Sequence, residues 1–220
     1  MFTPSAEIYA HWNDKNSFYS TYDPSPYIAP IEHPIKIFVD QGHNFAGHCN
    51  SGAQGNGLDE GAVTYEIGVR LAALLESDPR FEVKLSRPTR DTVLGTDNTS
   101  ALRVRSSAAN SWGADYFVSI HCNSASASSA HGTEVYSYDS PSDGSRLAGC
   151  ILNSLCSATG LTSRGTKVNP DLAVLRQTVM TAVLVETAFI SNPSEAALLS
   201  SNPGLFAQGI YNGIVAFCFG

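Results

Sequence analysis

From Ile35 onward, the chain alternates short apolar runs with segments whose apolar residues recur every three or four positions. Continuous apolar runs that stop at glycine or polar residues are typical of buried strands. These predicted strands span 35–40, 81–87, 115–123, 132–138, 172–178 and 180–189. The three-to-four spacing is typical of helices that bury one face. These predicted helices span 60–76, 99–112, 141–159, 193–199 and 203–217.

Strands that alternate with helices, and that are apolar on both faces, indicate an α/β fold. We predict one domain over residues 35–220, with a mixed, mostly parallel twisted sheet of about six strands and helices on both faces. Residues 1–34 are rich in proline and show no sustained periodicity. They predict an extended N-terminal arm whose aromatic residues pack onto the domain, or alternatively a disordered leader.

Charge and composition narrow the classes of function. The chain has 13 Lys and Arg against 20 Asp and Glu, a formal net charge of −7. We expect no nucleic-acid partner, because no basic patch is available to neutralise phosphates. We expect no membrane insertion, because no apolar run reaches the length of a membrane-spanning helix. Residues 1–15 lack the regions of a signal peptide, so the export route is not indicated.

The cysteines do not indicate a structural framework. Five are present, at 49, 122, 150, 156 and 218, and no C-x-x-C pair occurs. An odd number excludes complete pairing in disulfides, and the missing pairs disfavour a cysteine zinc ribbon. Other catalytic motifs are also missing: there is no G-x-S-x-G and no H-E-x-x-H. The stretch at 160–167 lacks the ending of a phosphate-binding loop, and we predict an ordinary loop there.

Four groups capable of metal binding or proton transfer lie where the predicted strands end. His43 follows the strand at 35–40, and His121 and Glu186 lie near the ends of the strands at 115–123 and 180–189. Glu60 opens the helix at 60–76. In open α/β sheets, ligands bind beyond the carboxyl ends of the strands. Two imidazoles and one carboxylate form the ligand set of a hydrolytic zinc site, and a further carboxylate serves as its general base.

Each residue also has a structural interpretation. A histidine after a strand is often only hydrogen-bonded, and Glu60 could simply interact with the helix dipole. Glu186 is harder to explain, because it interrupts an apolar run and a buried unpaired carboxylate costs several kcal/mol. His48 and Glu66 are close enough in sequence to His43 and Glu60 to be rival ligands.

Five motifs occur in the order and approximate spacing of one known family. They are FVDQGH, EGAVTYEIGVRLAALL, ALRVRSSAANSWGADYFVSIHCN, GTEVYSY and VLVETAFISNPSE. From about Ile35 to Phe217, the chain thereby resembles the zinc-dependent N-acetylmuramoyl-L-alanine amidases of the amidase-3 type. Members of that family are bacterial and phage enzymes that cut peptidoglycan. The family commonly has more glycine after its first histidine, where this chain has Asn44 and Phe45, so a different groove wall is expected.

The resemblance implies a site and an activity. It makes His43, Glu60 and His121 the ligands of one Zn²⁺, and Glu186 the catalytic glutamate. The implied reaction is hydrolysis of the amide between N-acetylmuramic acid and L-alanine in peptidoglycan, outside the cell or in its wall. No protein partner is implied. Nothing resembles the inserted autoinhibitory helix of the division-linked members, so an open groove is expected.

Several alternatives stay open at this point. A zinc carboxypeptidase-like exopeptidase would keep the metal and change the substrate. A catalytically inactive wall-binding module would keep only the affinity for peptidoglycan. Asn123 and Arg176 are candidates for substrate binding from their position alone. A phage lysin and the catalytic part of a secreted enzyme both fit the sequence.

Overall fold

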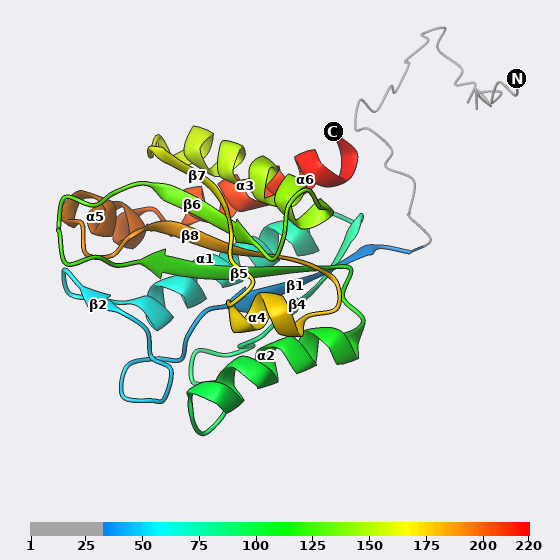
Figure 1. Cartoon of the computed structure of the whole chain (residues 1–220), viewed down its shortest axis with the longest axis horizontal. Helices are drawn as coiled ribbons and strands as arrows, with labels where there is room; N and C mark the ends of the chain where they lie inside the picture. The colour runs from blue at the N-terminus through cyan, green and yellow to red at the C-terminus, as the bar shows by residue number, and fades with distance from the viewer. Residues whose placement is uncertain (1–32) are drawn as a thin grey trace, which may run out of the picture.

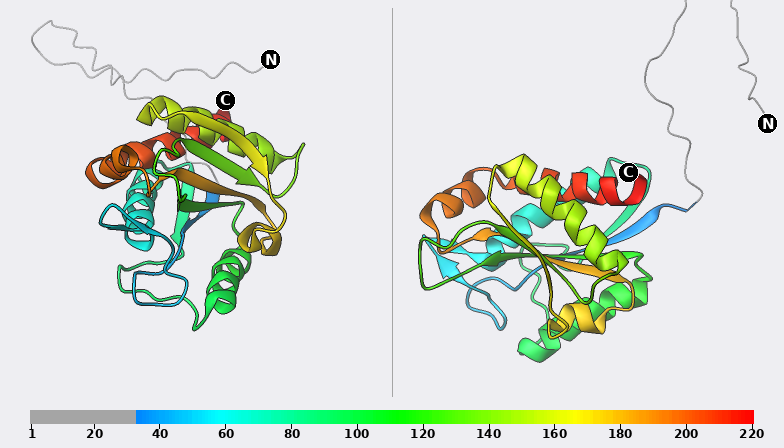
Figure 2. Two further views of the ribbon diagram at one scale, coloured as in Figure 1. Left: turned by 60° about the vertical axis from the view of Figure 1, so that its left-hand side comes forward. Right: turned by 45° about the horizontal axis from the view of Figure 1, so that its top comes forward.

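A computed structural model describes residues 33–220, so nearly all of the predicted arm at 1–34 lies outside the described residues. A six-stranded sheet lies between two layers of helices (Figures 1 and 2). Helices α1 (Glu60–Glu76), α3 (Asp143–Thr159) and α6 (Pro203–Phe219) cover one face, and α2 (Asn98–Trp112) and α4 (Ala173–Gln177) cover the other. Helix α5 (Pro193–Ser201) follows the last strand. None of these helices has the length and apolar character of a membrane span.

The sheet is mixed and mostly parallel, as predicted. Its strand order is β4-β1-β5-β8-β6-β7. Strands β4, β1, β5 and β8 run parallel, β6 is antiparallel to β8, and β7 is parallel to β6. The carboxyl ends of β1, β5 and β8 therefore share one edge of the sheet, and β6 begins at that edge. The bounds are β1 Ile35–Gln41, β4 Phe81–Leu85, β5 Tyr116–Asn123, β6 Thr133–Ser137, β7 Ser163–Val168 and β8 Thr181–Phe189.

Two local predictions are wrong. The apolar run at 172–178, predicted as a strand, forms the short helix α4, in which the adjacent residues Val174 and Leu175 are both buried. A strand on a sheet surface would have alternated them between two faces. The segment at 160–167, predicted as a loop, contains most of the edge strand β7. Its side chains are polar and largely exposed, so no apolar pattern marks it. A small ribbon, β2 (Gln54–Gly55) and β3 (Leu58–Asp59), also lacks such a signal.

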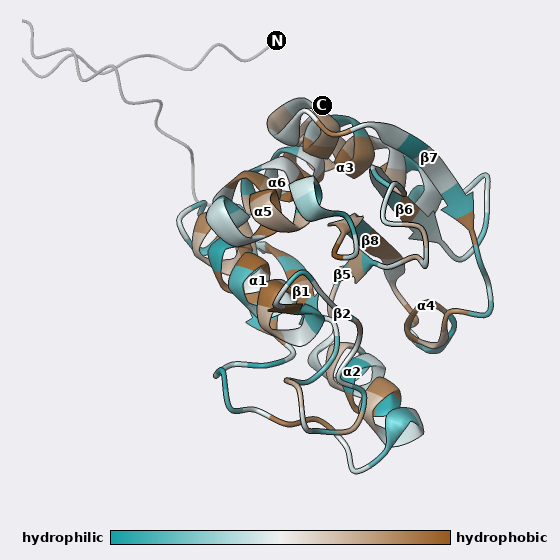
Figure 3. Cartoon of the chain, turned by 90° about the vertical axis from the view of Figure 1, so that its left-hand side faces the viewer, coloured by the Kyte–Doolittle hydropathy of each residue, from teal (hydrophilic) through white to brown (hydrophobic). Residues whose placement is uncertain are grey.

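The sheet face under α2 and α4 changes character along its strands. Near the amino-terminal ends it presents apolar side chains, among them Phe38, Phe117 and Leu184. Because alternate residues share a face, the same rows continue to polar residues farther along. These continuing residues are Asp40 on β1, Ser119 and His121 on β5, and Glu186 on β8. Figure 3 views the molecule from the side toward which these strands run.

A buried ion pair fastens α2 to the end of β1. Arg105 Nη1 lies 2.6 Å from Asp40 Oδ1, and both side chains are at most 1% exposed. Ser119 Oγ donates to the second Asp40 oxygen at 2.7 Å. Burial alone would raise the pKa of Asp40, but the Arg105 guanidinium and these hydrogen bonds outweigh it and hold the pKa below 3.8. The Asp40 carboxylate is therefore ionised, and each of its two oxygens has a hydrogen-bond partner.

We expect the Asp40→Asn variant to lose about 3 kcal/mol of unfolding free energy, because it leaves the Arg105 charge buried without its counter-ion. Urea denaturation at neutral pH measures the change. The control is Asp143→Asn, which breaks the exposed pair of Asp143 with Arg146 and should cost at most about 1 kcal/mol. Equal losses in the two variants would contradict a structural role for the buried pair.

Candidate metal centre

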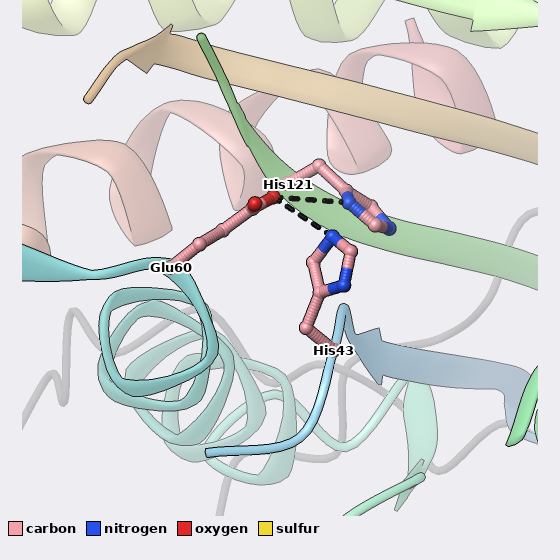
Figure 4. A group of neighbouring side chains, drawn as sticks. All are labelled: His43, Glu60 and His121. Atoms are coloured by element: carbon pink, nitrogen blue, oxygen red, sulfur yellow. Dashed lines mark hydrogen bonds and ion pairs between the residues drawn. The ribbon is translucent and has the colours of Figure 1, made fainter. Parts of the chain in front are cut away.

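Three side chains from separate elements converge at the carboxyl edge of the sheet (Figure 4). His43 follows β1, Glu60 is the first residue of α1, and His121 lies in β5. His43 Nε2 and His121 Nδ1 each lie 3.2 Å from Glu60 Oε1. One potential ligand atom from each residue lies within 4.8 Å of the other two. The structure thus brings together the three residues that the sequence selected as a ligand set.

The backbone at His43 is held in an unusual conformation. Its φ of 64° lies in the left-handed region, which a non-glycine residue adopts only when its surroundings enforce it. Arg105 Nη2 donates to the His43 carbonyl oxygen at 2.7 Å, and the His43 ring nitrogen Nδ1 lies 3.2 Å from the Asn50 carbonyl oxygen. That second contact orients the ring with Nε2 toward Glu60. At Gly42, a Cβ atom would come within 2.5 Å of His121 Nε2, so the preceding position requires glycine.

Asn44 holds the loop that follows His43. Its side chain is fully buried and donates to the carbonyl oxygens of Cys49 and Leu94, at 2.9 and 3.0 Å. It also accepts from the Leu94 backbone N–H at 3.0 Å. Asn44 therefore holds the loop in place on one side of the site. It stands at a position where the family commonly has glycine.

Glu60 is positioned by backbone donors on both sides. Oε2 accepts from Ala53 N at 2.8 Å, and Oε1 accepts from Cys122 N at 3.0 Å. Asp59 caps α1 by accepting from Ala62 N, which fixes where the helix begins. Burial raises the pKa of Glu60, but the imidazoles of His121 and His43 more than reverse this and leave the pKa well below 4.5. The side chain is therefore a carboxylate ready to bind a cation.

Glu186 has the opposite electrostatic character. It pairs in register with His121 across β5 and β8, so it lies beside the ligand set without belonging to it. Its Oε2 atom is buried and has no hydrogen-bond partner among the described residues. Burial, followed by the negative charges of Glu60 and Glu134, raises the pKa of Glu186 to about 8. A half-buried carboxyl group with an unused oxygen is suited to accepting and releasing a proton near neutral pH.

The rival ligands lie elsewhere. Glu66 is exposed and forms an ion pair with Arg70 one helical turn away. His48 is exposed on the loop after β1. Within residues 33–220, the metal-competent group consists of His43, Glu60 and His121.

Glu134, which the sequence does not single out, also lies at the site. Glu134 lies in β6 directly opposite Glu186, and its side chain is 3% exposed. Its carboxylate accepts hydrogen bonds from four side chains. These donors are Asn123 Nδ2, Tyr136 Oη, Arg164 Nε and Lys167 Nζ, at 2.8, 2.8, 2.7 and 2.5 Å. The one available signal was a glutamate within the apolar strand at 132–138, since both cations lie in the segment predicted as a loop.

The two residues predicted to bind substrate, Asn123 and Arg176, lie at different places relative to the cluster formed by the candidate metal centre, Glu186 and Glu134. Asn123 ends β5 and bonds to Glu134, so it lies beside the cluster. Arg176 lies in α4, ahead of β8, and donates to the carbonyl oxygens of Pro170 and Asp171. Five strand residues separate the start of β8 from Glu186, about 16 Å at the usual rise per residue. The structure therefore does not bring Arg176 to the cluster.

Comparison with known proteins agrees with this geometry. The family model described as N-acetylmuramoyl-L-alanine amidase, Amidase_3, matches residues 37–216. The chain is 35% identical to the N-acetylmuramoyl-L-alanine amidase CwlM of Bacillus licheniformis, over 82% of this chain and 67% of that protein. It is also 35% identical to the endolysin of Bacillus phage SPP1, over 81% of this chain and 64% of that protein.

A solved structure shows the same architecture. The catalytic domain of the amidase CwlV from Bacillus (Paenibacillus) polymyxa superposes with a TM-score of 0.73 at 33% identity. The match covers 83% of this chain and 97% of that domain. The chain therefore belongs to the Amidase_3 family of N-acetylmuramoyl-L-alanine amidases and is a peptidoglycan-hydrolysing enzyme.

Proposed function

We propose that His43, Glu60 and His121 bind one Zn²⁺ and that Glu186 is the catalytic base of the amidase reaction. The observation that carries this proposal is the convergence of the three donors within 4.8 Å, with the unpartnered Glu186 oxygen beside them. Two histidines and one carboxylate, with a position left for water or substrate, are the donor set of hydrolytic zinc sites. The donors present fit the ion that the family uses.

When bound, Zn²⁺ would supply a Lewis acid for the lactyl carbonyl oxygen and a positive charge that makes water easier to deprotonate. The other steps belong to the chain's own residues. Glu186 would accept a proton from the attacking water at Oε2 and then deliver it to the leaving amine of L-alanine. Its raised pKa suits both halves of this transfer, because a group that titrates near the working pH holds and releases a proton with little penalty.

Because peptidoglycan is the substrate, the proposed activity implies action on the wall, outside the cytoplasmic membrane. The exopeptidase alternative has less support, because the family model and the curated relatives are N-acetylmuramoyl-L-alanine amidases. The inactive-module alternative also has less support, because all four selected groups are present and convergent.

Digestion of purified peptidoglycan, with and without a zinc chelator, tests the proposed function. We expect new L-alanine amino termini that disappear with the chelator and return when Zn²⁺ is added. New reducing sugar ends would instead indicate a glycosidase. Persistence of the amino termini after complete removal of metal would contradict the zinc mechanism.

The Glu186→Gln variant tests the base directly. We expect turnover to fall at least about a hundredfold, the usual contribution of a general base, while one zinc ion per chain is retained. The control is Glu66→Gln, which alters the rival ligand and should preserve both activity and zinc content. Loss of zinc from the Glu186→Gln protein would indicate a ligand instead of a base.

Stability measured on metal-free protein gives a second prediction for Glu186→Gln. The folded-state pKa of about 8 lies above the ordinary value of 4.5, so Glu186 gives the folded state no penalty below pH 4.5. Above that pH the unfolded chain releases the proton more readily, and wild-type stability falls as pH rises toward 8. Glutamine cannot titrate, so the variant should gain stability relative to wild type as pH rises across this window. Thermal melts that show parallel pH dependence in the two proteins would contradict this.

A further inference from the structure

We propose that Arg164 and Lys167 form a subsite for a carboxylate of the substrate's stem peptide, on the residue that follows L-alanine. This inference rests on the proposed function and adds a determinant of substrate choice to it. Both residues lie on the edge strand β7, two strands from β8 in the sheet order.

The backbone of β7 directs the side chains of Arg164 and Lys167 to the same face of the strand. Residues three apart in a regular strand point to opposite faces. Arg164 and Lys167 nevertheless both donate to Glu134 Oε2, at 2.7 and 2.5 Å. The pairing of β6 with β7 shifts register here, and Gly165 has a left-handed φ of 87°. A glycine bulge re-aims neighbouring side chains in this way and is common beside binding sites.

The two cations, Arg164 and Lys167, carry more positive charge than the single carboxylate of Glu134 neutralises. Burial raises the pKa of Glu134, but Lys167 and Arg164 outweigh that effect and leave it below 4.5, so one carboxylate faces two cations. Arg164 uses Nε for Glu134 and Nη1 for the His131 carbonyl oxygen, which leaves Nη2 without a partner among the described residues. Lys167 uses one of its three N–H donors. Both side chains are 38% exposed, so these remaining donors are accessible to a ligand.

Aromatic rings fix the two cations in place. Arg164 lies over the ring of Phe189 at 4.9 Å, and Lys167 lies over the ring of Tyr136 at 5.6 Å. Cations that are already oriented lose little conformational entropy when they bind a carboxylate. The chain as a whole is strongly acidic, with a net charge of −7, so an excess positive charge at this place favours an anionic ligand.

The subsite lies at the right distance from the proposed base. Glu134 is directly opposite Glu186 on the neighbouring strand, and β7 is one strand farther. Adjacent strands are about 4.8 Å apart. Because both charged groups reach back to Glu134 Oε2, they lie about one strand spacing from the row of Glu186. An extended peptide advances about 3.5 Å per residue. A carboxylate on the residue after L-alanine therefore reaches the cations while the amide is at the metal centre.

Two muropeptides of identical glycan and peptide length test this inference. They differ only in the α-carboxyl group of the second, glutamyl residue, which is free in one and amidated in the other. We expect wild-type enzyme to show a kcat/KM about tenfold higher for the free carboxylate, mainly through a lower KM, as expected for one charge-assisted hydrogen bond.

Two variants separate substrate binding from structural effects. Lys167→Met keeps the aliphatic contact with Tyr136, and Arg164→Gln keeps an N–H donor at the position of Nε, which contacts Glu134, while removing the charge and Nη2. Each should reduce the preference to about twofold or less by raising KM for the carboxylate substrate only. The control is Lys84→Met on β4, which removes the same charge from a lysine that also lies over an aromatic ring, that of Trp112. It should retain the tenfold preference.

The outcomes distinguish this inference from the proposed function. Equal kcat/KM values of wild type for the two muropeptides would overturn the subsite and leave the amidase mechanism intact. Variants that slow both substrates equally would also overturn it, because such a loss reflects a changed Glu134–Glu186 environment. Failure of wild type to release L-alanine amino termini from whole peptidoglycan would contradict the proposed function itself.

Discussion

The buried pair of Asp40 and Arg105 is the interaction on which the geometry of the site depends. One guanidinium binds the Asp40 carboxylate, the Gln41 carbonyl oxygen and the His43 carbonyl oxygen. It thus links α2 to the backbone at the end of β1 and just beyond it, where His43 adopts its left-handed conformation. A buried ion pair adds little net stability by itself, but breaking it is costly, so it specifies one arrangement of the chain. Here that arrangement directs the His43 imidazole toward Glu60 and His121, the other two members of the candidate metal centre.

The sheet positions the other residues of the site. Parallel strands β1, β5 and β8 bring residues distant in sequence to one edge, and the face under α2 and α4 changes there from apolar to polar. Two glutamates at this edge have opposite properties. Glu60 receives hydrogen bonds and is stabilised as an anion, whereas Glu186 is desolvated and lies near the negative charges of Glu60 and Glu134. This separation of the two carboxyl pKa values suits Glu60 to its proposed role as a ligand and Glu186 to its proposed role in proton transfer.

Much of this was predictable from the sequence, and the exceptions have physical causes. Apolar periodicity located the central strands and the long helices, because burial imposes it. It failed for β7, whose exposed polar residues carry no such pattern, and for α4, whose short apolar run resembles a strand. The four proposed metal and catalytic residues could be selected because each follows, opens or interrupts an apolar element. Glu134 also interrupts an apolar strand, but its contact with Arg164 and Lys167 could not be predicted, because that contact depends on a bulge at Gly165 and on the pairing of β6 with β7.

Zinc K-edge X-ray absorption on the zinc-loaded wild-type enzyme, repeated on Glu186→Gln and Glu66→Gln, tests the proposed ligands and base. We expect two histidine nitrogens at about 2.0 Å and at least one carboxylate oxygen at about 2.0–2.2 Å, with the same spectrum in all three proteins. A spectrum that loses an oxygen ligand in the Glu186→Gln protein would place Glu186 on the metal and contradict its role as base. A first shell containing one histidine or none would contradict the assignment of His43 and His121 as the ligand pair.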